Sequence, residues 1–178
     1  HKKLAAYLTK NSIPKITALI TTFNEEKNIE KCIKSIEWAD EILVIDSFST
    51  DNTIAICESL GATVLQHKYN YAADQKNWAI PQAKHPWIVL LDADEEASPN
   101  LASELKNLLY TRPKHTAYWM WRENYFLGKK VRFCGWQNDR VVRFFHRDFH
   151  RYENKMVHEE IEQTKPFGRL KSKIIHYT

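Results

Sequence analysis

A short apolar run that leads into four acidic residues is the strongest constraint on the fold of this 178-residue chain. Trp87–Leu91 form the run, and the acids Asp92, Asp94, Glu95 and Glu96 follow it. Because the run is far shorter than the ~20 residues that span a bilayer, it predicts a buried β-strand. Unpaired carboxylates are costly in a dry core, so they must emerge at the strand's carboxyl end, where open α/β sheets bind ligands. The alternative is an acidic loop that caps the next helix.

Strand-like runs alternate with amphipathic helices through the first 111 residues. β-Branched and apolar residues predict strands at 16–22, 41–46, 62–67 and 87–91. Apolar residues at helical spacing predict helices after residue 24, capped by Thr22 or Asn24, after residue 51, and at 72–83 and 99–110. The alternation indicates βαβ units, and therefore an α/β fold whose Rossmann-like, mainly parallel sheet is flanked by helices.

The pattern changes after residue 111. Strand-like runs at 116–125, 129–133 and 140–146 are separated by polar turns, which predicts antiparallel additions to the sheet in the C-terminal half. No linker, repeat or low-complexity segment divides the chain. We therefore expect a single domain over residues 1–178 with two functional halves, 1–111 and 112–178.

Glycine and cysteine usage excludes several classes of protein. The four glycines cannot build the G-x-G-x-x-G loop of a nicotinamide dehydrogenase or the Walker loop of a P-loop NTPase. The three cysteines form no C-x-x-C pair, so neither a zinc finger nor a disulfide framework is supported, and a reducing compartment is the default. The sequence also contains no secretory signal and no apolar run near twenty residues.

Charge is distributed unevenly along the chain. Residues 1–111 hold 15 acidic residues against 11 lysines, whereas residues 112–178 hold seven acidic residues against 15 basic ones, including all eight arginines. Clustered arginine suits the recognition of phosphate or carboxylate groups, although a solvated basic face is the common alternative. No recognised nucleic-acid-binding motif accompanies the basic half, so we expect no nucleic-acid partner.

Five short motifs follow one another along the chain: ITTFNEE at 20–26, ILVIDSFSTDNT at 42–53, QKNWA at 75–79, LDADE at 91–95 and VHE at 157–159. In this order and spacing they resemble the motifs of family 2 glycosyltransferases. The 124–139 region is most similar to the bacterial lipopolysaccharide core β-1,4-glucosyltransferase branch. The resemblance covers residues 16–178 and implies a GT-A fold, a nucleotide-sugar donor, a divalent metal ion (Mg²⁺ or Mn²⁺) and inversion at the anomeric carbon. It makes 1–111 the nucleotide-sugar-binding half and 112–178 the acceptor-side half.

The resemblance implies that the metal ion and the diphosphate bind at the Asp-x-Asp motif. Asp94 is then the direct metal ligand, and Asp92 contacts the ribose or the waters of the metal. His158 is a candidate third ligand, because neutral imidazole suits such a site, and a structural histidine is its alternative. Glu95 and Glu96 are expected to be first-turn acids of the following helix.

The resemblance places further donor-binding residues at the first two strand ends and on the third helix. Asp46 would accept a hydrogen bond from uracil or ribose, with a turn cap as a serious alternative, since Ser47 stands where many relatives carry a second Asp. Thr22 and Glu25 would line the nucleoside pocket, unless Glu25 is only a helix-dipole acid. Lys76, beside Asn77, would pair with the diphosphate or with the acids, unless it is a surface lysine.

The general base and the acceptor contacts should come from the second half. Glu159, within the V-H-E motif, is the favoured base, Asp139 is the second choice and Glu160 the third. Asp139 could instead pair with a neighbouring arginine. Trp136 is the aromatic residue we expect to face the acceptor sugar. Phosphates of an anionic acceptor, or lipid headgroups, could meet the arginines at 140, 143, 147 and 151.

The sequence therefore predicts an inverting, metal-dependent glycosyltransferase. It would move a hexose, glucose by resemblance, from a UDP-sugar to a lipopolysaccharide core or other cell-surface glycan or glycolipid. We expect a cytoplasmic location with peripheral contact to an anionic membrane on its inner face. Relatives in this branch usually continue beyond a segment like His176–Thr178, so we expect the chain to be trimmed at this point. The alternatives are a sugar nucleotidyltransferase, which usually needs a glycine-rich first loop, and a non-catalytic basic module that binds nucleic acid or anionic membranes.

Overall fold

The computed structural model describes residues 13–131, 139–155, 160–162 and 166–177. Trp136, His158 and Glu159, to which the sequence assigned roles, lie outside the described residues.

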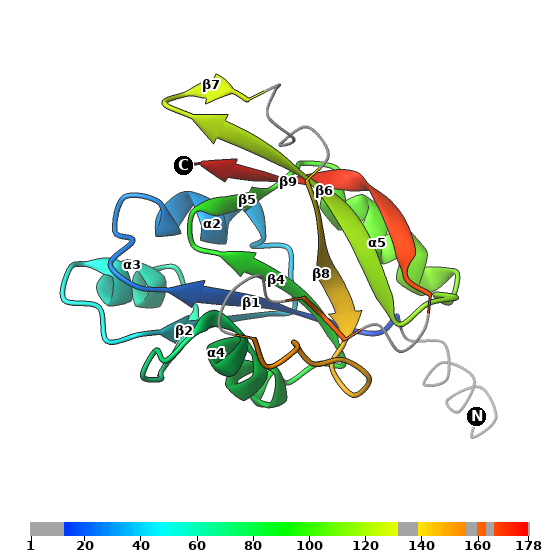
Figure 1. Cartoon of the computed structure of the whole chain (residues 1–178), viewed down its shortest axis with the longest axis horizontal. Helices are drawn as coiled ribbons and strands as arrows, with labels where there is room; N and C mark the ends of the chain where they lie inside the picture. The colour runs from blue at the N-terminus through cyan, green and yellow to red at the C-terminus, as the bar shows by residue number, and fades with distance from the viewer. Residues whose placement is uncertain (1–12, 132–138, 156–159, 163–165, 178) are drawn as a thin grey trace, which may run out of the picture.

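The first half of the chain forms a parallel sheet with its helices, as predicted. Its strands are β1 (Ile16–Thr22), β2 (Glu41–Asp46), β3 (Thr63–Gln66) and β4 (Trp87–Asp92). Its helices are α2 (Ile29–Ser35), α3 (Thr53–Ser59), α4 (Ala72–Ala79) and the 3₁₀ turn η1 (Ile80–Gln82), which contains Pro81. The strands lie in the order β3-β2-β1-β4, all parallel, so their carboxyl ends meet at one edge (Figure 1).

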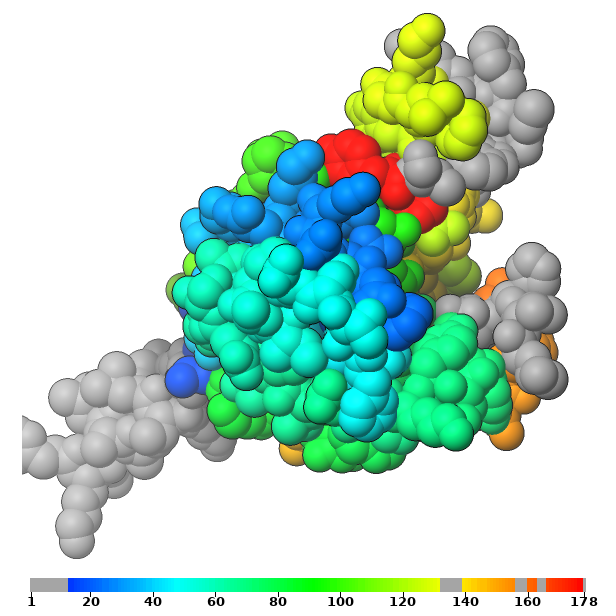
Figure 2. All heavy atoms as spheres, turned by 90° about the vertical axis from the view of Figure 1, so that its left-hand side faces the viewer, coloured from blue at the N-terminus to red at the C-terminus, as the bar shows by residue number. Residues whose placement is uncertain are grey.

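The rest of the chain extends the same sheet. The first half ends with β5 (Glu95–Ala97) and α5 (Leu101–Tyr110), and the second half contributes β6 (Ala117–Phe126), β7 (Lys129–Lys130), β8 (Arg140–His146) and β9 (Gly168–Tyr177). The order continues from β4 through β8, β6 and β9 to β5, and β7 pairs with β6. β8 is antiparallel to both β4 and β6, whereas β9 is parallel to β6. Figure 2 views the side on which β1 ends, where the β6–β7 hairpin projects from the body.

Two apolar layers cover the faces of the sheet. On one face α2, α3 and α5 pack their apolar side chains against alternate residues of β1 and β4. On the other face α4 and η1 cover the remaining residues of β1, β2 and β4, together with Tyr152 and Ile161. Both faces of β1 and β4 are buried, so β4 consists of a continuous apolar run before Asp92, and β1 consists of apolar residues and buried threonines. No helix in the described ranges is long and apolar enough to cross a membrane.

Two expectations about local structure were wrong. Glu95 and Glu96 lie in strand β5, antiparallel to β9, and α5 begins only at Leu101. The helix after β1 begins at Ile29 and is not capped by Thr22 or Asn24. Asn24 instead adopts a φ of 52°, and its backbone N–H donates a hydrogen bond to Ser49 Oγ at 2.8 Å, which joins the loops after β1 and β2.

Strand β9 was missed, although its buried and exposed residues alternate. Its first residue, Gly168, lies so close to the ring of Tyr118 that a Cβ there would overlap the ring. Tyr118 is itself buried between Trp87, Phe144 and His115. The absence of a side chain at Gly168 therefore permits the parallel pairing of β9 with β6.

Candidate active site

The carboxylate of Asp92 is held by groups from three other elements. Thr21 Oγ1, on β1, donates to Asp92 Oδ1 at 2.9 Å, and Lys76 Nζ, on α4, lies 3.3 Å from the same oxygen. Arg143 Nη2, on β8, donates to Asp92 Oδ2 at 2.5 Å. Burial raises the pKa of Asp92, but the charges of Arg143 and Lys76 and the hydrogen bonds from Arg143 and Thr21 outweigh it and hold that pKa well below its ordinary value. Asp92 is therefore an ionised, fixed carboxylate at the end of β4.

Glu95 lies behind Asp92 and is fully buried. It accepts hydrogen bonds from Arg143 Nη2 at 2.9 Å and from Arg122 Nη1 at 3.4 Å. Its second oxygen accepts the backbone N–H of Asp92 at 3.0 Å. A buried carboxylate needs such compensation, and here two arginines from β8 and β6 supply it. This explains why Glu95 sits in a strand and not in the first turn of α5.

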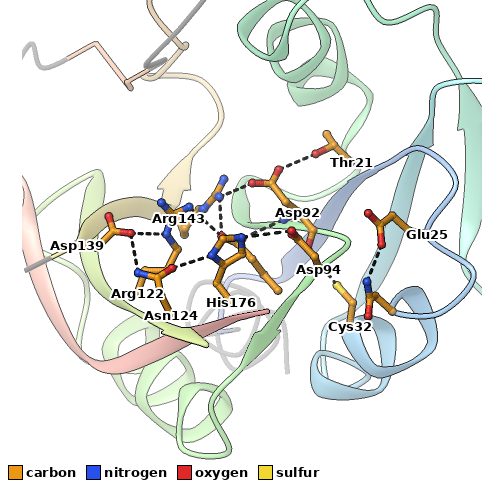
Figure 3. Close-up of polar contacts among 12 residues, drawn as sticks. Thr21, Glu25, Cys32, Asp92, Asp94, Arg122, Asn124, Asp139, Arg143 and His176 are labelled. Carbon is orange, nitrogen blue, oxygen red and sulfur yellow. Dashed lines mark hydrogen bonds and ion pairs between the residues drawn. The ribbon is translucent and has the colours of Figure 1, made fainter. Parts of the chain in front are cut away.

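Asp94 begins a second series of contacts, drawn in Figure 3. His176 Nε2, on β9, lies 3.3 Å from Asp94 Oδ2, and the Asp94 hydrogen bond raises the pKa of His176 above its ordinary value. The other ring nitrogen, Nδ1, lies 2.7 Å from Asn124 Oδ1. Asn124 Nδ2 and Arg122 Nε both donate to Asp139 Oδ2, at 3.1 and 2.7 Å. The Asp-x-Asp motif and Asp139 thus belong to one polar network.

A pocket of about 350 Å³ opens beside this network. Asp92, Asp139 and Arg143 line it together with Tyr152 and Glu160. Two of the three residues predicted as bases, Asp139 and Glu160, therefore share a cavity with the first Asp of the motif. Both contacts of Asp139 described above use Oδ2, which leaves Oδ1 for other partners.

A second hollow lies on the other side of the motif, at the ends of β1 and β2. A pocket of about 250 Å³ is lined by Thr22 and Glu25 as well as by Asp92 and Asp94. The hydroxyl of Thr22 is buried and has no hydrogen-bond partner within the described residues. An unsatisfied buried hydroxyl is costly and marks a place where a ligand atom can bind.

Three exposed aromatic rings surround the adjoining pocket, which has a volume of about 590 Å³. They are Phe23, Phe48 and Tyr69, each more than half exposed, and Ser47 and Lys68 complete the lining. Phe48 adopts a φ of 62°, unusual for a residue with a side chain, in the turn directly after β2. The rings offer flat surfaces on which a base can stack.

Two residues that were predicted to contact the substrate, Asp46 and Asn77, form hydrogen bonds within the protein. Asp46 is fully buried, and its carboxylate accepts the backbone N–H of Ser49 at 2.9 Å and Gln66 Nε2 at 3.2 Å, which favours the turn-cap alternative. Asn77 binds the backbone of Tyr152 in both directions, donating from Nδ2 at 2.9 Å and accepting on Oδ1 at 2.8 Å. Asn77 therefore fixes the wall of the pocket that Tyr152 lines.

The residues present fit a divalent metal site of two protein ligands. No cluster of three or more His, Cys, Asp or Glu side chains suited to a metal ion occurs in the described ranges. Asp92 is engaged by Arg143 and Lys76, whereas Asp94 and His176 face each other and are about one third and one fifth exposed. A carboxylate and an imidazole are ligands that Mn²⁺ accepts, with substrate phosphates completing its shell.

Sequence reasoning missed the residues that come from the C-terminal strands. These are Arg122, Asn124 and His176, together with the buried roles of Glu95 and Arg143. Arg143 was expected to meet an anionic acceptor, but it is 4% exposed and paired with Asp92 and Glu95. The segment RVVRFFH could have indicated this role, because Arg143 lies between apolar residues of a buried strand, where a charged side chain needs an ion-pair partner.

The fold is that of the GT-A class, with acids at the carboxyl ends of its parallel strands. Residues 17–168 match the model of glycosyl transferase family 2, and the chain belongs to that family. It is similar to the lipopolysaccharide core biosynthesis glycosyltransferase LpsC of Rhizobium meliloti, with 30% identity over 93% of this chain and 64% of LpsC. An uncharacterised glycosyltransferase of Rickettsia bellii is 45% identical over 52% of this chain and 32% of its own length. The chain thus spans about a third of the length of one of these relatives and just under two thirds of the other.

Solved structures support the same fold. The S. aureus TarS fragment 1–349 in complex with UDP-GlcNAc superposes with a TM-score of 0.53 at 22% identity, over 67% of this chain and 37% of that one. Glucosyl-3-phosphoglycerate synthase from Mycobacterium tuberculosis, in complex with Mn²⁺, UDP and phosphoglyceric acid, superposes with a TM-score of 0.52 at 22% identity, over 65% and 44% of the two chains.

Proposed function

We propose that this domain transfers a hexose, glucose in the first instance, from a UDP-sugar to a hydroxyl group of a cell-surface glycan, with inversion at the anomeric carbon. The observation that carries the proposal is the single polar network that joins Asp92, Asp94 and Asp139 beside one pocket. The names of the similar proteins support a UDP-sugar donor.

The donor would lie across the carboxyl ends of β1, β2 and β4. Its base would stack against the rings of Phe23, Phe48 and Tyr69, and the unsatisfied hydroxyl of Thr22 would bind the nucleoside. The diphosphate would then reach the Asp-x-Asp motif, where Asp94 and His176 would hold a divalent metal ion, Mg²⁺ or Mn²⁺. When bound, such an ion stabilises the charge of the diphosphate leaving group as a Lewis acid.

Lys76 and Arg143 keep Asp92 in place for this donor. Lys76 is 3% exposed, and its ammonium group also lies over the ring of Tyr152 at 5.4 Å from the centroid. Because both cations contact Asp92, its carboxylate stays ionised and cannot rotate toward the metal site. We infer that Asp92 binds the ribose side of the donor and leaves Asp94 as the direct metal ligand.

Asp139 is the general base in this proposal. It lines the pocket that also contains Asp92, and Arg122 and Asn124 orient it through Oδ2. Oδ1 would accept the proton of the acceptor hydroxyl as that oxygen attacks the anomeric carbon opposite the leaving diphosphate. Glu160 lines the same pocket and is the second candidate, and Glu159 keeps its place as a candidate from the V-H-E motif.

The acceptor would be a lipopolysaccharide core or related glycan, as the name of LpsC suggests. A sugar nucleotidyltransferase is disfavoured, because the loop after β1 contains no glycine to cover a triphosphate. A non-catalytic basic module is disfavoured because it gives no role to the acids at the strand ends. Peripheral contact with an anionic membrane stays a prediction.

Thermal unfolding with UDP and Mn²⁺ tests the donor site. A ligand at 100 times its dissociation constant stabilises a fold by about 2.7 kcal/mol, so UDP with Mn²⁺ should raise the melting temperature by several degrees. Asp94→Asn should lose the part of this rise that depends on Mn²⁺. Asp148→Asn, at an exposed aspartate outside the three pockets described above, is the matched control and should keep it.

Two results would overturn the proposal. One is that no nucleoside diphosphate stabilises the protein in the presence of Mn²⁺ or Mg²⁺. The other is release of pyrophosphate from a nucleoside triphosphate and a sugar phosphate, which would assign the protein to the nucleotidyltransferases.

A further inference from the structure

Trp121 lies in the middle of β6, between two strands that each contribute an arginine to its ring. Arg140, on β8, holds its guanidinium carbon 5.5 Å from the centroid of the indole. Arg169, on β9, holds its own at 5.1 Å. Strands β8 and β9 flank β6 on opposite sides (Figure 1), so the two arginines come from the two strands next to that of Trp121.

These two arginines differ from those of the Asp92 network. Arg122 and Arg143 are paired with carboxylates, whereas Arg140 and Arg169 are exposed and form no ion pair within the described ranges. The nearest acid along β6, Glu123, is already paired with Lys130 and Lys173. An anion that reaches either guanidinium therefore meets a positive charge that no carboxylate of the described residues offsets.

A guanidinium held by an aromatic ring keeps N–H donors available. The attraction between a cation and a ring is electrostatic and uses the face of the ring, so donor N–H groups can still bind a carboxylate or phosphate. The indole fixes the position of both side chains, which lowers the entropic cost of ordering them around a ligand.

The arrangement adjoins the proposed acceptor site. Arg140 lines the pocket of about 350 Å³ that contains Asp92 and Asp139. Trp119, on the same strand, also lines that pocket and packs against the apolar layer on the α4 side of the sheet. An acceptor sugar whose hydroxyl meets Asp139 would therefore extend its neighbouring residues toward Arg140 and Trp121.

We propose that Trp121, Arg140 and Arg169 form a subsite for an acidic sugar of the acceptor, one that carries a carboxylate or a phosphate group. This inference rests on the proposed function, since it assigns the chemical class of the acceptor for that reaction. It predicts that acceptors with an acidic residue next to the reacting sugar are preferred over neutral ones.

The test follows the indole N–H signal of Trp121 in ¹H–¹⁵N NMR spectra, assigned with Trp121→Phe. The probes are glucuronic acid, glucose 6-phosphate, neutral glucose and inorganic phosphate. Both acidic sugars should bind at least about tenfold more tightly than glucose, the factor expected from one charge-assisted hydrogen bond. Comparison of the two distinguishes a carboxylate from a phosphate site.

Arginine variants assign the effect. Arg140→Gln and Arg169→Gln should each remove the preference for acidic sugars. Arg112→Gln, an exposed arginine that follows α5 and lines none of the pockets described above, is the matched control and should retain it. Stabilisation by UDP and Mn²⁺, measured on the same samples, should be unchanged in all three variants, because the donor site lies at the ends of β1 and β2.

Each adverse result has a separate meaning. If UDP with Mn²⁺ stabilises the protein but acidic sugars bind no more tightly than glucose, the subsite is refuted and the proposed function stands. If inorganic phosphate binds as tightly as glucose 6-phosphate, the site recognises an anion and not a sugar, which also refutes the subsite. If UDP fails to bind while the acidic sugars bind, the glycosyltransferase assignment fails.

Discussion

Replacement of Glu95 by Gln tests the buried ion network most directly. The substitution keeps the size of the side chain and an oxygen that can accept the backbone N–H of Asp92. It removes the negative charge that Arg143 and Arg122 contact at 2.9 and 3.4 Å. The free energy of unfolding should therefore fall because two arginines lose a charged partner in the interior.

The expected loss follows from the contacts that remain. Breaking a buried ion pair by removing one partner costs about 3–5 kcal/mol. Arg143 keeps Asp92 and Arg122 keeps Asp139, so we expect the lower end, about 3 kcal/mol, for Glu95→Gln. Glu96→Gln, on the same strand but partly exposed, should cost less than about 1 kcal/mol.

Urea unfolding at neutral pH measures the difference. With a denaturant slope of about 2 kcal/mol per molar, a loss of 3 kcal/mol lowers the midpoint by roughly 1.5 M. A cycle with Arg143→Gln isolates the coupling, because the double variant should lose less than the sum of the single variants. Equal midpoints for Glu95→Gln and Glu96→Gln would refute the claim that the network holds the strand ends together.

Three further predictions concern the C-terminal half. Gly168→Ala should destabilise the fold by about 1–3 kcal/mol in urea unfolding, because its Cβ overlaps the buried ring of Tyr118, and an unchanged midpoint would contradict the packing described. Hydrogen bonds from Lys130 and Lys173 lower the pKa of Glu123 to about 2, so the stability that these contacts provide is present above pH 4.5 and is lost as the pH falls toward 2. The melting temperature of Glu123→Gln should approach that of the wild type over this interval, and a constant difference would count against the pairing. Asp139→Asn should lower the rate of sugar transfer by at least about 100-fold while UDP binding persists, and retention of the rate would move the role of base to Glu160 or Glu159.

The local sequence pattern predicted the strands whose formation depends on residues close together in the chain. The apolar run 87–91 and its β-branched counterparts predicted β1, β2 and β4, because buried parallel strands need apolar residues on both faces. The same pattern located the acids at the strand ends, and the GT-A fold followed from the motifs. Strand β9 was not predicted, although its buried positions alternate with exposed arginine and lysine residues, as in a half-exposed strand.

Long-range pairing decided the roles of the individual acids. Asp46 and Asp92 both end apolar strands, yet Asp46 is fully buried at the end of β2 and Asp92 lines two pockets. The difference arises from Ser49 and Gln66 around Asp46 and from Arg143 around Asp92, and strand order, not local pattern, brings Arg143 to Asp92.

The sequence by itself determined that this chain builds a parallel sheet with carboxylates at one edge, since hydrophobic periodicity and the cost of burying charge act over a few residues. Only the tertiary structure decided that Glu95 is a buried ion-pair partner and that Asp94 faces His176. These contacts join β5 and the turn before it to β8 and β9, and the pairing of strands distant in the chain depends on packing that no single segment encodes.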